Sequence, residues 1–101
     1  MIKIYTTSWW GPCIAAKKML DGMDMLYENI DIEKHGLSRD DLAKITGGHT
    51  VPQIIINDKA IGGFNELLQL NNSGKLKELF ENDWYYKKKY SSVLQRTYGI
   101  W

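Results

Sequence analysis

The sequence predicts one α/β domain with a four-stranded mixed sheet flanked by helices. Short segments in which apolar and polar residues alternate, as they do in strands, are separated by runs with helical periodicity. Their order along the chain is strand, helix, strand, then a helix, then a β-hairpin, then further helices. A chain of 101 residues is long enough for one modest core. A change of composition after residue 81 divides the chain into a body, residues 1–81, and an extension, residues 82–101.

The first third of the chain predicts a strand–helix–strand unit. Residues 2–5 alternate as a strand does, and Pro12 suits the first position of a helix, which is expected to run to about Asp21. Residues 26–32 form the next predicted strand. Two strands joined by a helix of this length are expected to be parallel. The helical residues expected to face the core recur at helical spacing: Cys13, Ala16 and Leu20.

The middle of the chain predicts a short helix and a hairpin. Ser38 and Asp41 have the spacing of a capping box, which starts a helix by pairing its first backbone N–H groups. Residues 53–56 and 59–61 are expected to be antiparallel strands joined by the two-residue turn 57–58.

Two helices are predicted after the hairpin. Residues 64–70 form the first, with three leucines available for burial: Leu67, Leu68 and Leu70. The second is indicated by Leu76, Leu79 and Phe80.

The extension, residues 82–101, has four basic residues, one acid and half of the aromatic residues of the chain. On a helix, several of its apolar side chains fall on one side. We expect an amphipathic helix that packs on the body or on a second copy. The alternative is stacking on single-stranded nucleic acid, which the net charge of only +1 disfavours.

Composition excludes several classes of protein. No apolar run is long enough for a membrane span and no signal peptide is evident, so we expect a cytoplasmic protein. A single cysteine, Cys13, excludes an intramolecular disulfide. With His35 and His49 it makes a poor metal-ligand set, and no metal site is expected.

Three motifs, found in order along the chain, carry a resemblance to a known family. Residues 9–13, Trp-Trp-Gly-Pro-Cys, resemble the thioredoxin motif Trp-Cys-Gly-Pro-Cys, while the residues flanking them look more like a glutaredoxin. The segments 50–54 and 61–64 are the other two motifs. Together they make residues 1–81 similar to a glutaredoxin, which implies a thioredoxin-like fold.

The resemblance implies a catalytic pair at Trp10 and Cys13. In the family the first cysteine of the motif attacks a disulfide and the second resolves the mixed disulfide. Cys13 matches the second cysteine, and Trp10 occupies the place of the first. Because indole cannot attack a disulfide, the dithiol cycle should be lost. Cys13 alone is either a redox thiol or a small core residue partly covered by Trp10; we favour the core residue.

Two origins of Trp10 are open. It is either a natural loss that leaves a binding module, or a substitution, natural or engineered, in an active redox protein. We favour the substitution, because the rest of the site is present.

The resemblance also implies a substrate site. The residue before a cis proline offers its backbone to a peptide-like thiol, and a diglycine turn at a helix start receives a carboxylate of glutathione. Asn65 stands where an Asp commonly meets the ammonium group of glutathione, and Thr7 stands where many members have Lys. The residues assigned to this site, including an apolar docking Trp, are Trp9, Thr50, Val51, Pro52, Gly63, Phe64 and Asn65.

These residues imply a thiol–disulfide oxidoreductase. It would pass electrons from glutathione, as co-substrate, or from a reductase to protein disulfides such as those of ribonucleotide reductase. Trp10 is expected to impair this activity. The alternative is a redox-inactive module that keeps the groove for a partner protein.

Overall fold

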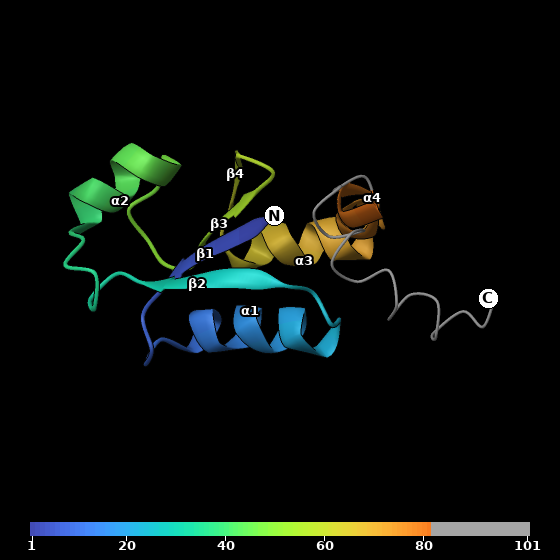
Figure 1. Cartoon of the computed structure of the whole chain (residues 1–101), viewed down its shortest axis with the longest axis horizontal. Helices are drawn as coiled ribbons and strands as arrows, with labels where there is room; N and C mark the ends of the chain where they lie inside the picture. Colours follow the sequence, from blue (N-terminus) through green and yellow to red (C-terminus); the bar gives the residue numbers. More distant parts are fainter. Residues whose placement is uncertain (82–101) are drawn as a thin grey trace.

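A computed structural model describes residues 1–81, and the helix predicted for residues 82–101 lies outside this range (Figure 1). All eight predicted elements of the body are present, most with bounds that differ by one or two residues from those expected. In chain order they are β1 (Ile2–Thr6), α1 (Gly11–Gly22), β2 (Tyr27–Asp31), α2 (Arg39–Thr46), β3 (Gln53–Ile56), β4 (Lys59–Gly62), α3 (Phe64–Asn72) and α4 (Lys75–Glu81).

The strands form one mixed sheet in the order β2-β1-β3-β4. β1 is parallel to β2 and antiparallel to β3, so Ile4 lies between Asn29 and Ile54. β3 and β4 form the predicted hairpin. Its turn residues, Asn57 and Asp58, have φ values of 51° and 67°, as a two-residue turn with the twist of the sheet requires. The predicted four-stranded mixed sheet is confirmed.

The larger part of the core lies where α1 and α3 contact each other and the sheet. Ala16 and Leu20 are fully buried there, as their spacing predicts. Leu67 of α3 is also fully buried, but Leu68 is 37% exposed, so the prediction that it is available for burial was wrong. The reason is that α3 turns only the Leu67 side toward the sheet, and the adjacent residue points away from it.

The capping box at the start of α2 is confirmed in both halves. The Asp41 backbone N–H donates to the Ser38 hydroxyl, and the Ser38 N–H donates to the Asp41 carboxylate, each at 3.0 Å. This N–H holds the pKa of the Asp41 carboxyl below its usual value. The helix ends at Gly47, whose φ of 85° suits glycine.

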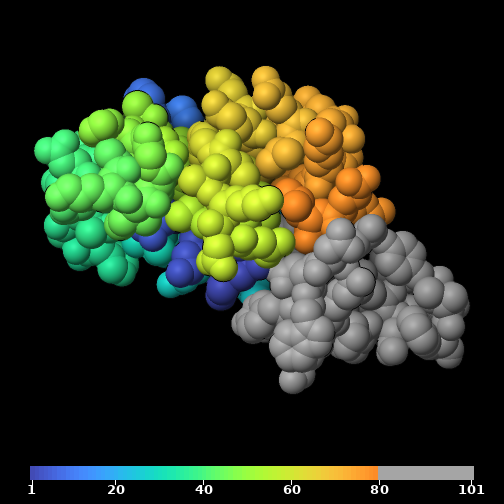
Figure 2. Space-filling view, turned by 90° about the horizontal axis from the view of Figure 1, so that it is seen from above, coloured from blue at the N-terminus to red at the C-terminus, as the bar shows by residue number. Residues whose placement is uncertain are grey.

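The C-terminal end of α2 lies near the β3–β4 hairpin, and Figure 2 shows these two segments on one face of the molecule. Three chain segments distant in sequence therefore approach one another at this side: the end of α2, the hairpin and the start of α3. Among residues 1–81 no helix has the length and apolar character needed to cross a bilayer.

Candidate functional site

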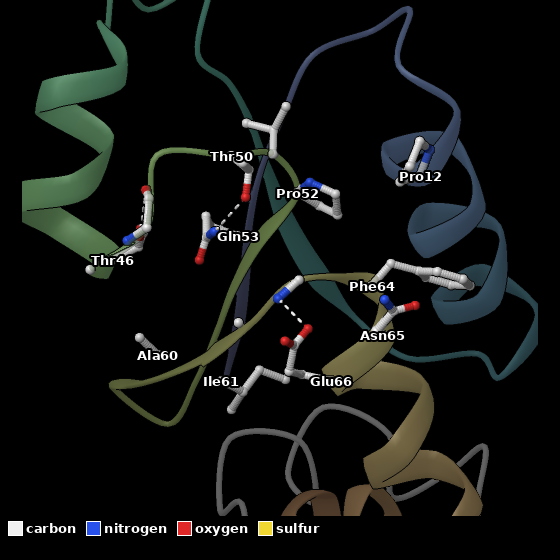
Figure 3. Close-up of a pocket in the computed structure, with 15 residues that line it drawn as sticks. Pro12, Thr46, Thr50, Pro52, Gln53, Ala60, Ile61, Phe64, Asn65 and Glu66 are labelled. Carbon is white, nitrogen blue, oxygen red and sulfur yellow. Dashed lines mark hydrogen bonds between the residues drawn. The ribbon is translucent and has the colours of Figure 1, made fainter.

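A pocket of about 600 Å³ lies between the start of α1, the loop before β3 and the start of α3 (Figure 3). The local sequence explains why these segments converge. Pro12 occupies the first turn of α1, after the loop that follows β1. The loop before β3 is held by the pairing of β3 with β1, and the diglycine pair ends β4 where α3 begins. Most of the predicted substrate site is thereby brought together, since these residues all line the pocket: Thr50, Val51, Pro52, Gly63, Phe64 and Asn65.

The Val51–Pro52 peptide bond is cis, and both residues are buried. Pro52 faces the starts of both α1 and α3 in the close-up (Figure 3). The backbone at the start of α3 comes near it, because a Cβ built on Gly63 would lie 3.3 Å from the Pro52 carbonyl oxygen. A side chain at residue 63 would crowd this contact, which is a physical reason for glycine there.

The start of α3 presents hydrogen-bond donors to the pocket. Gly63 is the residue before the helix, and its backbone N–H donates to the Glu66 carboxylate at 3.0 Å. The next N–H groups, those of Phe64 and Asn65, belong to the first helical turn and so have no acceptor within the helix. Unpaired N–H groups and the positive end of the helix dipole make this position suited to an anion.

The far wall of the pocket is polar and was not predicted. Gln53 is 6% exposed, and its side-chain amide donates to the Thr50 hydroxyl at 3.4 Å. The Thr46 hydroxyl donates to the Leu42 carbonyl at 2.9 Å and so ties its side chain to α2. The sequence signals for this wall were a glutamine at a buried strand position and the nearby glycine, Gly48. In the structure Gly48 makes room for the glutamine, because a Cβ there would lie 2.4 Å from the Gln53 amide nitrogen.

Cys13 borders neither this pocket nor the surface. It is 0% exposed, and its neighbours in the smaller core cluster are Tyr5, Ile32, Leu42 and Val51. The core cluster surrounds the thiol, and Trp10 is 46% exposed, so the partial cover by Trp10 stays a prediction. The core interpretation of this cysteine is the one that fits its position.

Burial raises the pKa of the Cys13 thiol. The backbone and hydroxyl of Thr7 oppose this rise, as do the charges of Lys17 and Arg39, but they do not cancel it. Within residues 1–81, the buried Thr7 Oγ1 makes no hydrogen bond of ordinary geometry, so its effect on the sulfur is one of proximity. A buried thiol with a raised pKa is a poor nucleophile.

Trp9 and Trp10 form a separate surface. Their rings meet edge to face, with centroids 6.1 Å apart, and they line a second pocket of about 360 Å³ together with Arg39 and His49. The Trp9 indole N–H donates to the Glu33 carboxylate at 2.8 Å, which fixes that ring. Thr50 and Val51 border both pockets and so connect this aromatic surface to the larger one.

The described part of the chain has no set of side chains arranged as metal ligands. Residues 1–81 contain no group of three or more His, Cys, Asp or Glu side chains placed to hold an ion. His35 and His49 are instead engaged locally. The His35 ring lies 2.9 Å from the Asp31 carbonyl oxygen, and the His49 ring lies 3.6 Å from the Asp40 carboxylate.

Comparison with known proteins identifies relatives of this chain. The family model described as Glutaredoxin matches residues 2–61. The chain is 37% identical over 78 residues to a glutaredoxin of Pseudomonas aeruginosa, a match that covers 77% of this chain and 93% of the relative. It is 31% identical over 80 residues to glutaredoxin 3 of Escherichia coli, with 79% and 96% covered.

Solved structures agree with the sequence relatives. The crystal structure of a buckwheat glutaredoxin–glutathione complex matches with a TM-score of 0.70 and 26% identity, covering 77% of this chain and 74% of that one. The solution structure of a glutaredoxin from Brucella melitensis matches with a TM-score of 0.64 and 30% identity, covering 77% and 85%.

Proposed function

Because the chain belongs to the glutaredoxin family, we propose that its larger pocket binds glutathione and that the site is built for thiol–disulfide exchange. One observation carries the proposal. The start of α1, the Val51–Pro52 bond and the first turn of α3 border a single pocket. Val51 would offer its backbone to the cysteinyl part of glutathione, and the Phe64 and Asn65 N–H groups would receive a carboxylate.

Exchange chemistry defines what the chain needs at residue 10. A thiolate attacks one sulfur of a disulfide, forms a mixed disulfide and releases the other sulfur as a thiolate. Trp10 sits at the residue before α1, where a thiolate would benefit from the helix N-terminus, but its indole has no atom that can attack. We propose that Trp10 stands at the nucleophile position and that turnover is impaired in this chain.

The proposal extends to the substrates of the protein and to its cellular compartment. The family relation supports a glutaredoxin-type redox function with protein disulfides and glutathione as the reacting partners. We propose that the protein disulfides include that of ribonucleotide reductase, that glutathione or a reductase supplies the electrons, and that the protein is cytoplasmic.

A glutathione-linked disulfide reduction assay tests the chemistry. We expect Trp10→Cys to gain activity, since it places a thiol at an exposed position at the start of α1. Trp9→Cys is the matched control. It places a thiol at a more exposed residue, 61% against 46%, but off the helix start. Equal activity of the two variants, or none from Trp10→Cys, would contradict the assignment of residue 10.

Binding is tested separately from chemistry. Glutathione titrated into the unmodified chain should shift the backbone NMR signals of Val51, Gly63 and Phe64. Shifts confined to other regions would contradict the pocket assignment whatever the activity assay shows.

A second candidate function is a redox-inactive module that binds a partner protein. The observation that favours it is that Trp9 and Trp10 expose their rings, while the only thiol of the chain, that of Cys13, is fully buried. This module would use the aromatic surface and the Thr50–Val51 backbone together. Retention of a specific partner by the unmodified chain, and its loss in Trp9→Ala, would support this function over the first.

A further inference from the structure

Gln53 places a carboxamide on the wall of the larger pocket without using all of its hydrogen-bonding capacity. The residue is only 6% exposed, and its amide nitrogen donates to the Thr50 hydroxyl at 3.4 Å, a long distance for such a bond (Figure 3). Within residues 1–81 the carbonyl oxygen, Oε1, accepts no hydrogen bond. Of the described side chains only that of Thr7 has a fully buried polar atom without a partner, so Oε1 keeps contact with the pocket. Buried polar groups are normally paired, and this oxygen is therefore available to a ligand.

The surrounding backbone holds this carboxamide in place. Gln53 pairs with Tyr5 of β1, which fixes the face of the sheet from which its side chain projects. A Cβ built on Gly48 would lie 2.4 Å from the amide nitrogen and 3.1 Å from Oε1, so the carboxamide packs against a loop residue that has no side chain. The nearby Thr46 hydroxyl already donates within α2, to the Leu42 carbonyl at 2.9 Å. The position of the carboxamide is thus set before any ligand arrives.

The carboxamide stands apart from the start of α3, to which a glutathione carboxylate is assigned. In Figure 3, Gln53 and Thr46 lie on one side of Pro52. Phe64 and Asn65, at the start of α3, lie on the other side. All of these residues line the same pocket. A ligand that contacts both Val51 and the carboxamide therefore extends away from α3 and occupies a part of the pocket that the proposed glutathione contacts leave open.

The chemistry of this part of the pocket suits a neutral hydrogen-bond donor. Of the residues that line the pocket only Glu66 has a formal charge, and it belongs to the first turn of α3. Around Gln53 the lining is glycine and threonine, which leaves an ion without a counter-charge. An uncharged carbonyl oxygen pairs well with the N–H of a peptide group. A protein disulfide substrate offers such N–H groups at every residue beside its cysteine, except at proline.

We propose that Gln53 is a specificity-determining residue that favours polypeptide substrates over glutathione, because its carboxamide oxygen accepts a backbone N–H of the polypeptide near the reactive cysteine. The inference deepens the proposed function and rests on it, since that function assigns both protein disulfides and glutathione to this pocket. Val51 would hold the cysteine residue in the manner of an added strand. Gln53 lies two residues further along the same segment, a step of about 7 Å, which two residues of an extended peptide also span.

The experiment measures dissociation constants by NMR titration on the full chain. Gln53→Met keeps the length of the side chain and removes the carboxamide. The two ligands are glutathione and the blocked peptide acetyl-Ala-Ala-Cys-Ala-amide, which has no formal charge and has further backbone N–H groups before its cysteine. We expect Gln53→Met to bind the peptide about three- to tenfold more weakly, the range for one neutral hydrogen bond. It should bind glutathione as the unmodified chain does, which also shows that the variant is folded.

Gln69→Met is the matched control, because it makes the same chemical change at an exposed residue of α3 that does not line the pocket. It should leave both affinities unchanged. Unchanged peptide binding by Gln53→Met would overturn the inference, and so would an equal loss for both ligands, which would show that Gln53 acts only by supporting Thr50. If the unmodified chain binds glutathione but not the peptide, the inference fails alone. If it binds neither ligand at Val51 and Gly63, the proposed function fails as well.

Discussion

The thiol of Cys13 should be almost unreactive in the folded protein. The side chain is 0% exposed and packs in a core cluster with Tyr5 and Val51, which are themselves 8% and 6% exposed. A reagent as large as an aromatic disulfide can therefore reach the sulfur only after the cluster opens. The raised pKa lowers the reactive thiolate fraction further.

The expected magnitude follows from the cost of that opening. Small domains unfold at a cost of about 5–15 kcal/mol, and opening a core cluster takes a large part of it. An opening cost of about 4 kcal/mol already slows the reaction about 10³-fold, since each 1.4 kcal/mol is a factor of ten. We expect native Cys13 to react at least about 10³ times more slowly than the denatured chain.

The assay is the rate of labelling by an aromatic disulfide reagent at pH 8, with and without denaturant. Trp10→Ala should leave the native rate unchanged if the buried residues of the core cluster are enough to cover the sulfur. Trp10→Cys should add a second, fast phase from a thiol at an exposed position. A native rate within tenfold of the denatured rate would refute the reasoning, and a large acceleration in Trp10→Ala would show that the indole is the cover.

The raised pKa also has a consequence for stability. The folded chain holds the thiol proton more tightly than the unfolded chain, whose thiol has a pKa near 9.0. This contribution is therefore fully present below pH 9.0 and is lost as the pH rises through the folded pKa. Urea unfolding from pH 8 to pH 11 should show a shallower alkaline loss of stability in Cys13→Ala than in the unmodified chain.

Three further predictions concern the frame around the site. Burial raises the pKa of Tyr27 to about 12, together with the Asp21 carboxylate, which accepts a hydrogen bond from the Tyr27 hydroxyl at 2.9 Å. Tyr27→Phe should therefore remove the tyrosinate signal that appears near pH 12 in an absorbance titration. Ser38→Ala should lower the free energy of unfolding by about 1 kcal/mol in urea titrations, because it removes the hydroxyl that caps α2, whereas Ser38→Thr should recover most of the loss. Gly48→Ala should displace the Gln53 amide and shift its side-chain NMR signals, because the new Cβ would lie 2.4 Å from the amide nitrogen; unchanged signals would show that the loop moves instead.

Local sequence signals predicted the elements and their ends well. The capping box at Ser38 and the turn at Asn57 depend on interactions within a few residues, so their chemistry is visible in the chain itself. The order of the strands is different in kind. The antiparallel pairing of β1 with β3 joins residues about 50 positions apart, and no local pattern specifies it. The sequence therefore predicted a four-stranded mixed sheet but not the order of its strands.

Side-chain environments were the least predictable part of the site. Helical spacing placed Cys13 on the core face but could not give the depth of burial, which depends on Leu42 and Val51 from distant segments. Leu68 differs from Leu67 only by one step around the helix axis, yet one is exposed and the other buried. The contact of the Glu66 carboxylate with the Gly63 N–H was not predicted, because it depends on the backbone path of the two glycines before it.

Trp10 does not line the larger pocket, although Thr50 and Val51 border both that pocket and the one that Trp10 lines. The pocket is formed by the Val51–Pro52 backbone, the start of α3 and the polar wall at Gln53, and Trp10 is not among the residues that line it. Under the proposed function, a substitution at residue 10 should therefore change the attacking group and leave the surface that recognises a ligand in place. It follows that the unmodified chain and the Trp10→Cys variant should use the same ligand pocket. A thiol that the unmodified chain binds should therefore be the thiol that Trp10→Cys uses in turnover.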